Sequence, residues 1–336
     1  MNKKYLVSAL GNAIVDTLIL TDDNFLLENS IAKGSMTLID QDMANKLSNL
    51  EYQKISSGGS VCNTVATISA LGEKCSFLGK VGDDKFGQIF TNHLQESNCD
   101  FKSQCSDIAN STSKSFILVS KEDGERTMMT YLGKSSEIDH INNNEIIEES
   151  KILYIEGYLW DKKETINVLN NIIIDAKKNN ISTAFTLSDS FCVSRHKNDF
   201  LNLIKNIDVL FANEDEIKIL MDIENSVLKQ EKLNNIFNIN PDVKLIITRS
   251  EKGCLIVTQD NLEKIETDII DNVIDSTGAG DAFAAGFLFA MSKNFDLKKN
   301  AKIGNFLASK IIQKIGARFD DAEIKKIKKE LCQFGI

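Results

Sequence analysis

The sequence predicts an α/β fold in which a doubly wound, mostly parallel sheet is flanked by helices and carries a small β-sheet lid. Along most of the chain, apolar runs of strand length alternate with amphipathic segments of helix length, the order of a β–α–β protein. Two segments rich in β-branched residues, about 14–39 and 112–131, interrupt that alternation. We therefore expect the 336 residues to form a single domain with a lid built from these two segments.

The main-sheet strands are expected where short apolar runs are bounded by glycine or polar residues. These runs are 5–11, 75–82, 151–157, 182–188, 209–213 and 244–250. Amphipathic or small-residue runs between them predict helices. The clearest are 60–72, 86–98 and 164–180. In the second lid segment two alternating runs flank Asp123-Gly124, a turn dipeptide that predicts a β-hairpin.

Length and composition limit the class of protein. With 42% hydrophobic residues the chain can bury a large core, and it has no run of 18 apolar residues that would predict a membrane span. A formal net charge of −9 argues against non-specific nucleic-acid binding. The seven cysteines are scattered without a CxxC pair, which favours reduced thiols over a zinc site. We expect a cytoplasmic protein, monomeric or homodimeric, whose partners are small molecules.

The segment DSTGAGDAFAAGFLFA, residues 275–290, joins a glycine-rich loop to an apolar helix. Gly278 and Gly280 tolerate positive φ and leave room for an oxyanion. The N–H groups of Gly278, Ala279 and Gly280 would lie at a helix N-terminus, where negative charge is favoured. Asp281 would then be a carboxylate inside an anion site, which suits a base that takes a proton from a hydroxyl attacking a phosphoryl group. The structural alternative is an acid that stabilises the first turn of the helix.

The usual nucleotide-binding fingerprints are absent from the sequence. Residues 133–135 have the GKS tail of a Walker A loop, but Met128 occupies the position of its first glycine. The GxGxxG pattern is also missing around Gly278. These absences disfavour both a P-loop protein and a nicotinamide-dependent oxidoreductase.

The 275–290 segment resembles the signature of the ribokinase-like (PfkB-type) carbohydrate and nucleoside kinases, and other segments extend the resemblance over nearly the whole chain. The resemblance implies a ribokinase-like fold, ATP as co-substrate and Mg²⁺ as cofactor. It also implies that Asp281 is the catalytic base and that the Gly278, Ala279 and Gly280 N–H groups bind the transferred phosphoryl. The segments GNAIVD, AKGSMTLID and RTMMTYLG look most like the adenosine-kinase-like branch.

The same resemblance implies a set of substrate-binding residues. GGSVCN matches the family's GG-x-x-x-N element, in which Gly58 and Gly59 admit the sugar and Asn63 bonds a hydroxyl. Asp16, in GNAIVD, matches the acid that holds sugar or ribose hydroxyls. Arg126, on the lid hairpin, is implied to reach phosphate or substrate when the lid closes. Taken alone, these residues would be a tight turn, an edge-strand acid and a surface ion pair.

Asn213 and Glu216, in NEDE, resemble the family's N-x-x-E element on the ATP side. The resemblance implies that Glu216 organises Mg²⁺ through water, and one well-placed carboxylate suffices where phosphates and water complete the shell. Without the resemblance, NEDE would be interpreted as a helix N-cap with acids in the first turn.

Three further ATP-side residues belong to TRSEKG. Thr248 and Gly253 resemble the family's T-x-G-x-x-G loop, and Arg249 is a candidate phosphate contact. Ser250 replaces the first glycine of that loop, which leaves its local shape open.

The C-terminal part of the chain contributes the remaining candidates. Asn305 stands eleven positions before Gly316-Ala317, a spacing that resembles the adenine-binding segment and the turn after it. In potassium-activated relatives that turn, with the equivalents of Asp275 and Thr277, surrounds a monovalent cation. The resemblance therefore implies a possible K⁺ site here.

The expected function is an ATP-dependent phosphotransferase acting on a primary hydroxyl of a ribosyl or sugar substrate, with adenosine favoured. The alternative is a ribokinase- or fructokinase-type sugar kinase. Adenosine needs an apolar slot for its base, and Phe25 on the lid side is a candidate for that slot. A catalytically silent ligand sensor on the same fold is a third hypothesis, which the intact DSTGAGD and N-x-x-E elements disfavour.

Overall fold

The main sheet is the centre of the computed structural model, which describes residues 3–106, 112–138, 147–224 and 227–336. Its strands are β1 (Tyr5–Leu10), β5 (Cys75–Gly82), β6 (Cys99–Ser106), β9 (Ser150–Glu156), β10 (Ser182–Thr186), β11 (Val209–Asn213), β12 (Lys244–Thr248), β13 (Cys254–Val257) and β14 (Leu262–Ile265). Within the described residues their order is β14-β13-β12-β11-β10-β9-β1-β5-β6. Every pair from β12 to β6 is parallel, whereas β13 and β14 add an antiparallel edge.

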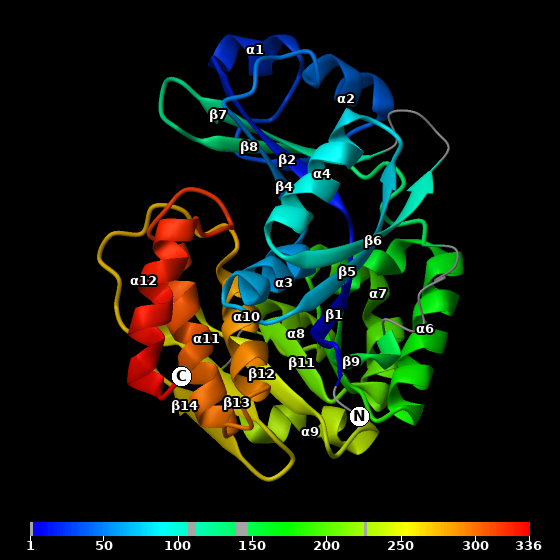
Figure 1. Cartoon of the computed structure of the whole chain (residues 1–336), viewed down its shortest axis with the longest axis vertical. Coiled ribbons are helices and arrows are strands. Elements are labelled where there is room, and N and C mark those ends of the chain that lie inside the picture. The colour runs from blue at the N-terminus through cyan, green and yellow to red at the C-terminus, as the bar shows by residue number, and fades with distance from the viewer. Residues whose placement is uncertain (1–2, 107–111, 139–146, 225–226) are drawn as a thin grey trace.

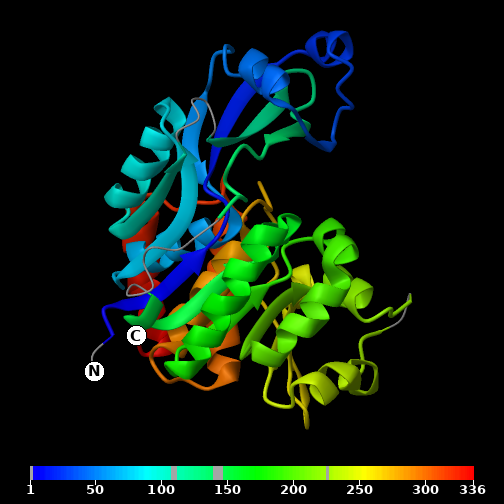
Figure 2. The same ribbon diagram turned by 90° about the vertical axis from the view of Figure 1, so that its right-hand side faces the viewer.

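Helices cover both faces of this sheet (Figures 1 and 2). One face carries α3 (Ser60–Ala70), α4 (Lys85–Glu96), α10 (Ala279–Met291), α11 (Leu297–Ile311) and α12 (Asp321–Leu331). The other carries α6 (Lys163–Lys178), α7 (Ser190–Leu203), α8 (Glu214–Leu220) and α9 (Gln230–Ile239). Short 3-10 turns occur at Gly157–Asp161, Ile204–Asn206, Ser250–Lys252 and Cys332–Phe334.

The central strands contribute side chains to the hydrophobic cores on both faces of the sheet. In β9, Tyr154 packs into the core of the first face, and its neighbours Leu153 and Ile155 pack into the core of the second. All six residues of β1 are buried, as expected for a strand covered by helices on both sides. The predicted doubly wound fold is confirmed.

A second sheet stands above the main one as a lid (Figures 1 and 2). Its strands are β2 (Ile14–Thr21), β3 (Met36–Leu38), β4 (Lys54–Gly58), β7 (Ser113–Ser120) and β8 (Arg126–Tyr131), in the order β3-β8-β7-β2-β4. Helices α1 (Asp23–Glu28) and α2 (Gln41–Leu47) contribute to a small core on one face of this sheet. The predicted hairpin is the antiparallel pair β7–β8, while β4 lies outside both segments assigned to the lid from sequence.

The topology places a crevice-forming switch point between β1 and β9. These strands are neighbours in the sheet, yet from β1 the chain continues to β5 and β6 on one side and later returns to β9 and β10 on the other. Ligands of open α/β sheets bind outside the carboxyl ends of strands at such a point. Asn12 follows β1 and Glu156 ends β9, and the Asn12 N–H donates to Glu156 Oε1 at 2.7 Å.

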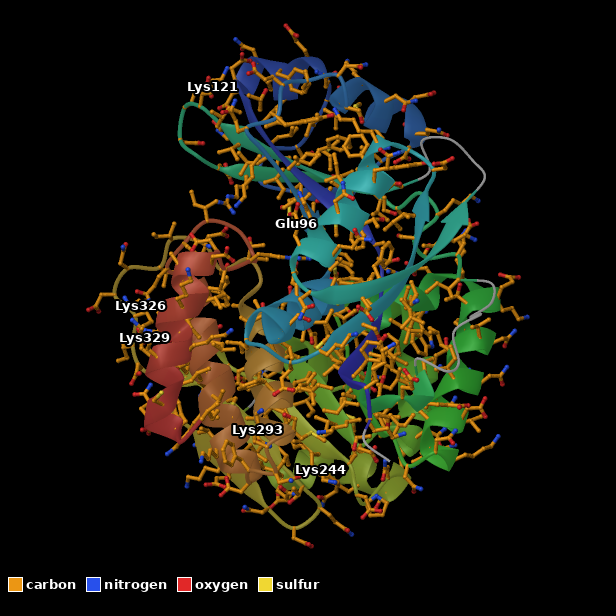
Figure 3. The ribbon with its side chains drawn as sticks, in the orientation of Figure 1. Glu96, Lys121, Lys244, Lys293, Lys326 and Lys329 are labelled. Atoms are coloured by element: carbon orange, nitrogen blue, oxygen red, sulfur yellow. The ribbon has the colours of Figure 1, made fainter. Side chains whose placement is uncertain are left out.

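The lysine-rich C-terminal run lies on α12. Lys326 and Lys329 are exposed and extend from its outer side (Figure 3), so this run is a solvated helix face. Among the residues that the structure describes, no helix has the length and apolar character needed to cross a membrane.

Candidate active site

Asp281 lies in the first turn of α10 and bonds to α3, an element more than 200 residues away in the chain. Its Oδ1 accepts from Ser60 Oγ at 2.7 Å, and its Oδ2 accepts from Asn63 Nδ2 at 2.9 Å. Burial raises the pKa of Asp281 to about 6, although the two hydrogen bonds and the positive charge of Arg318 oppose that rise. The result is a carboxylate whose pKa lies close to neutral pH.

Asp16 reaches toward this group from strand β2 of the lid. A Cβ on Gly58 would lie 2.1 Å from Asp16 Oδ2, so only glycine leaves space for the carboxylate. Burial raises the pKa of Asp16 to about 7, and the negative charge of Asp281 contributes to the rise while Arg318 opposes it. Asp281, the predicted base, and Asp16, the predicted hydroxyl anchor, therefore influence each other's charge state, and both are affected by the positive charge of Arg318.

Glu156, the last residue of β9, is a third buried acid near Asp281. It is 1% exposed, and its two carboxylate oxygens accept from the backbone N–H groups of Asn12 and Val61. Gly59, with φ of 97°, caps α3 beside Asn12. Burial raises the pKa of Glu156 to about 7. Glu156 thus ties the ends of β1 and β9 to the start of α3.

The glycine loop before α10 has the shape expected for an anion site. Gly278 is in the left-handed region with φ of 79°, and a Cβ there would lie 2.5 Å from the Cβ of Ala317. A Cβ on Gly280 would meet nothing within 4 Å, so this residue faces open space. The Ala279 N–H donates to the Ser276 carbonyl at 3.1 Å, which makes it a weaker candidate donor than its neighbours in this conformation.

Arg126 connects the lid to this loop through Asp275. Its Nη1 lies 2.7 Å from Asp275 Oδ2. The same carboxylate accepts from the N–H groups of Thr277 and Gly316. Burial alone would raise the pKa of Asp275, but these donors outweigh it and lower the pKa to about 2. A guanidinium occupies the carboxylate that a K⁺ site would use, and the K⁺ site stays a prediction.

Asn213 and Glu216, predicted to lie on the ATP side, form a capping box at the start of α8. Asn213 Oδ1 accepts from the Glu216 N–H at 2.8 Å, and Glu216 Oε2 accepts from the Asn213 N–H at 3.0 Å. Asn213 Nδ2 also donates to Glu216 Oε1 at 2.6 Å. Burial raises the pKa of Glu216 to about 7, and the nearby acid Asp189 adds to the rise. The NEDE segment therefore forms the helix N-cap that its sequence predicts, and the charge of Asp189 acts on its Glu216.

Thr248 lies beside Asn213, because the two residues pair in the parallel register of β11 and β12. Arg249 follows and donates to Glu214 Oε2 at 2.9 Å. In the turn after it, Ser250 adopts φ of 51° and Gly253 adopts φ of 73°. Ser250 therefore takes the left-handed conformation that the family's glycine would favour.

Asn305 is buried on α11 and faces the end of β14. Its Nδ2 donates to the carbonyl of Glu266 at 3.1 Å. The structure thus places it at the boundary between α11 and the loop after β14. A role in adenine binding stays a prediction.

Side chains on the open face of the lid sheet form rows across the strands. The row that contains Asp16 is mostly polar: Ser56, Asp16, Ser115 and Thr130, with Leu38 at its end. The next row ends in aliphatic side chains: Lys54, Leu18, Ile117, Met128 and Met36. Because Arg126 lies on the same face as Met128 and bonds to the body, this face looks toward the glycine loop.

Phe25 is not part of that face. It packs against the lid core together with the buried Leu26 of α1, and that core contains Phe116 from the opposite face of the sheet. The expectation that Phe25 lines the base slot is wrong, because α1 covers the far side of the lid.

Arg318 is the main residue that the sequence analysis missed. It donates from Nε to Asn63 Oδ1 at 3.1 Å and from Nη2 to Cys62 Sγ at 3.1 Å. A signal was available, since the chain has 35 lysines and only four arginines. Three of those arginines, Arg126, Arg249 and Arg318, lie among the candidate site residues.

Comparisons with known proteins agree on a family. Residues 31–324 match the pfkB family carbohydrate kinases. The adenosine kinase of Sinorhizobium meliloti superposes with a TM-score of 0.83 at 34% identity, over 97% of this chain and 99% of that one. A probable sugar kinase from Rhizobium etli CFN 42 superposes with a TM-score of 0.84 at 32% identity, over 99% of each chain. The adenosine kinase of Saccharomyces cerevisiae is 24% identical over 94% of this chain and 97% of its own length.

Proposed function

The chain belongs to the pfkB family of carbohydrate kinases, and we propose that it transfers the γ-phosphoryl group of ATP to a primary hydroxyl of a ribosyl substrate, with adenosine as the favoured acceptor. That it is an ATP-dependent kinase follows from the family. The acceptor and the roles of individual residues are the substance of the proposal.

Asp281 is the proposed general base. A carboxyl with a pKa of about 6 is mostly ionised at pH 7 yet basic enough to accept a hydroxyl proton as the oxygen attacks phosphorus. Ser60 and Asn63 hold its two oxygens, so its orientation is set before the substrate arrives. Asp16 is proposed to accept hydrogen bonds from the vicinal hydroxyls of the ribose.

The backbone of the glycine loop is the proposed anion hole. Positive φ at Gly278 turns the chain into α10, and the absence of a side chain at Gly280 lets an oxyanion approach the helix N-terminus. The phosphoryl group would gain most from alignment and fixed charge, as phosphoryl transfer requires. Arg126, 2.7 Å from Asp275 on the same loop, is placed to add positive charge from the lid.

Residues on the ATP side fit Mg²⁺ as the cofactor that the family implies. Glu216 is buried, and the negative charges of Asp189 and Asp215 add to the rise of its pKa, so a dication near Glu216 would offset an excess of negative charge. Bound through water near Glu216, Mg²⁺ would neutralise charge on the β- and γ-phosphate oxygens. Asn213, Thr248, Arg249, Gly253 and Asn305 are the proposed ATP-binding residues.

One observation carries the preference for adenosine: next to the polar row that contains Asp16 lies an aliphatic row, which consists of Leu18, Ile117, Met128 and Met36 beyond Lys54. Met128 and Met36 are 38% and 50% exposed, unusual for large apolar side chains on a sheet face that looks into a site. A ribose held by the polar row would place its base against the aliphatic one, which would remove that surface from water. A free sugar would leave the aliphatic row uncovered.

The alternative is a sugar kinase, which the 32% identity to a probable sugar kinase favours. Release of ADP from Mg-ATP should be measured with adenosine, other nucleosides, ribose, fructose and fructose 6-phosphate, with Asp281→Asn as the control. We expect turnover with adenosine that the substitution abolishes. Turnover with a sugar alone would overturn the acceptor assignment, and binding without turnover of any acceptor would favour the silent sensor.

A further inference from the structure

Arg318 bonds to α3, the helix whose Ser60 and Asn63 donate to Asp281. It follows the turn at Gly316, where φ is 88°, and its half-buried side chain reaches α3. Its side chain donates hydrogen bonds to two consecutive residues of that helix, Cys62 and Asn63. Because guanidinium is a planar fork of donors, two such bonds fix its orientation as well as its position.

The bond to Asn63 also determines what Asp281 meets. A carboxamide can present either its oxygen or its nitrogen to a neighbour, and only the nitrogen can donate to a carboxylate. Arg318 takes the Asn63 oxygen at 3.1 Å, which leaves Nδ2 for Asp281 Oδ2 at 2.9 Å. Reversal of the amide would place a donor against Arg318 and an acceptor against Asp281, so Arg318 locks the productive orientation.

The charges around Arg318 come from several elements. Its positive charge acts on the acids Asp16 on β2 and Asp281 on α10, and on Cys62 of α3, His93 of α4 and Cys99 of β6. Glu156 of β9 acts on Cys62, and Lys54 of β4 lies close to the turn at Gly316. The positive charge of Arg318 opposes the effect of burial on the pKa values of both Asp16 and Asp281.

We propose that Arg318 is a positioning residue for phosphoryl transfer, which orients Asn63 toward the base and supplies the positive charge that the carboxylates of Asp16 and Asp281 share. This inference rests on the proposed role of Asp281. Arg318 acts through Asn63 and through the local field, and its task is finished before the phosphoryl group moves.

Arg318→Met and Arg318→Lys test the inference through the pH dependence of kcat/KM with adenosine and Mg-ATP. The wild-type rate should rise as pH passes through about 6, where Asp281 loses its proton. Arg318→Met should lower kcat/KM roughly 10- to 100-fold at pH 7, the range for a lost charged hydrogen bond. In Arg318→Met the increase of kcat/KM with pH should also occur at higher pH, because Asp16 and Asp281 lose their neighbouring positive charge.

Arg318→Lys should restore the pH at which the rate rises more fully than it restores the rate, since lysine supplies charge but not the planar fork. Arg195→Met is the matched control, because Arg195 pairs with Asp161 on the exposed side of α7. A uniform loss of rate in Arg318→Met at every pH, with the rise still near the wild-type value, would overturn the inference.

A second readout needs no acceptor. A carboxyl whose pKa is raised on folding makes the folded protein less stable as pH rises from about 4, its unfolded pKa, to its pKa in the folded state. Arg318 limits that loss for Asp16 and Asp281, which titrate near 7 and 6. The drop in Tm caused by Arg318→Met should therefore be larger at pH 8 than at pH 5. An equal drop at both would contradict the inference, whereas failure of adenosine turnover in the wild type would count only against the proposed acceptor.

Discussion

The acceptor side and the ATP side of the candidate site are held together in different ways. On the acceptor side, Ser60 and Asn63 bond to Asp281 across 221 and 218 positions of the chain. On the ATP side, Asn213 and Glu216 bond to each other within one helical turn. A contact between distant elements has no local structural purpose, whereas a capping box would form in any helix with that sequence. The acceptor side is therefore the stronger evidence for chemistry.

The base gives the largest expected effect. Asp281→Asn keeps the shape of the side chain and removes its capacity to accept a proton, so kcat should fall by on the order of 10²–10⁴. Calorimetry should find adenosine binding within a few-fold of the wild type. Turnover close to wild type would remove Asp281 from the mechanism and with it the distinction between the two sides.

The lid acid should affect binding more than turnover. Asp16→Ala removes the proposed partner of two ribose hydroxyls, and affinity for adenosine should fall roughly 10- to 100-fold. The measurement is calorimetric titration of adenosine. Unchanged affinity would show that the hydroxyl site is elsewhere.

A third test asks whether Glu216 organises Mg²⁺ or only caps helix α8. Glu216→Gln should raise the Mg²⁺ concentration needed for half-maximal rate by roughly 10- to 100-fold, the range for a lost partner in a metal site. Glu323→Gln is a matched control, because Glu323 completes the second capping box, at the start of α12. Both variants should lose similar thermal stability. If both left the Mg²⁺ dependence unchanged, Glu216 would be a helix cap and nothing more.

The aliphatic row should give the smallest effect. Met128→Gln should raise KM for adenosine about 5- to 30-fold, because the base would cover a polar side chain in place of an apolar one. Leu27→Gln, at a position 75% exposed on α1, should change nothing. If Met128→Gln raised KM for a free sugar as much as it raised KM for adenosine, the result would contradict the assignment of the aliphatic row to a nucleoside base.

Most of the fold could be predicted from the sequence, because strands and helices are marked by the residues of each segment itself. Strand 209–213 was placed to the residue, and the small apolar residues after Asp281 predicted the buried helix α10. Strand β4 was missed because KISSG is short and mostly polar, and it is a strand only through its antiparallel pairing with β2. Likewise, β13 and β14 are four-residue strands, of which β13 pairs with β12 and β14 pairs with β13.

The site was accessible only where motifs are contiguous. GAGD and GGSVCN pointed to Asp281, Gly58 and Asn63 as candidates, but nothing near position 318 indicated that its side chain reaches α3. The scarcity of arginine was an unused clue. A chain that uses lysine for surface charge would place the rigid guanidinium fork where geometry matters.

The central claim, that the acceptor side is assembled before ATP binds, is tested most directly by equilibrium binding of adenosine to the wild-type protein without ATP or Mg²⁺. The account predicts saturable one-to-one binding that Asp16→Ala weakens and Asp281→Asn largely preserves. Binding of adenosine only after addition of a non-hydrolysable ATP analogue would contradict it, because the acceptor site would then be formed by the nucleotide rather than by the contacts between α3, α10 and the lid.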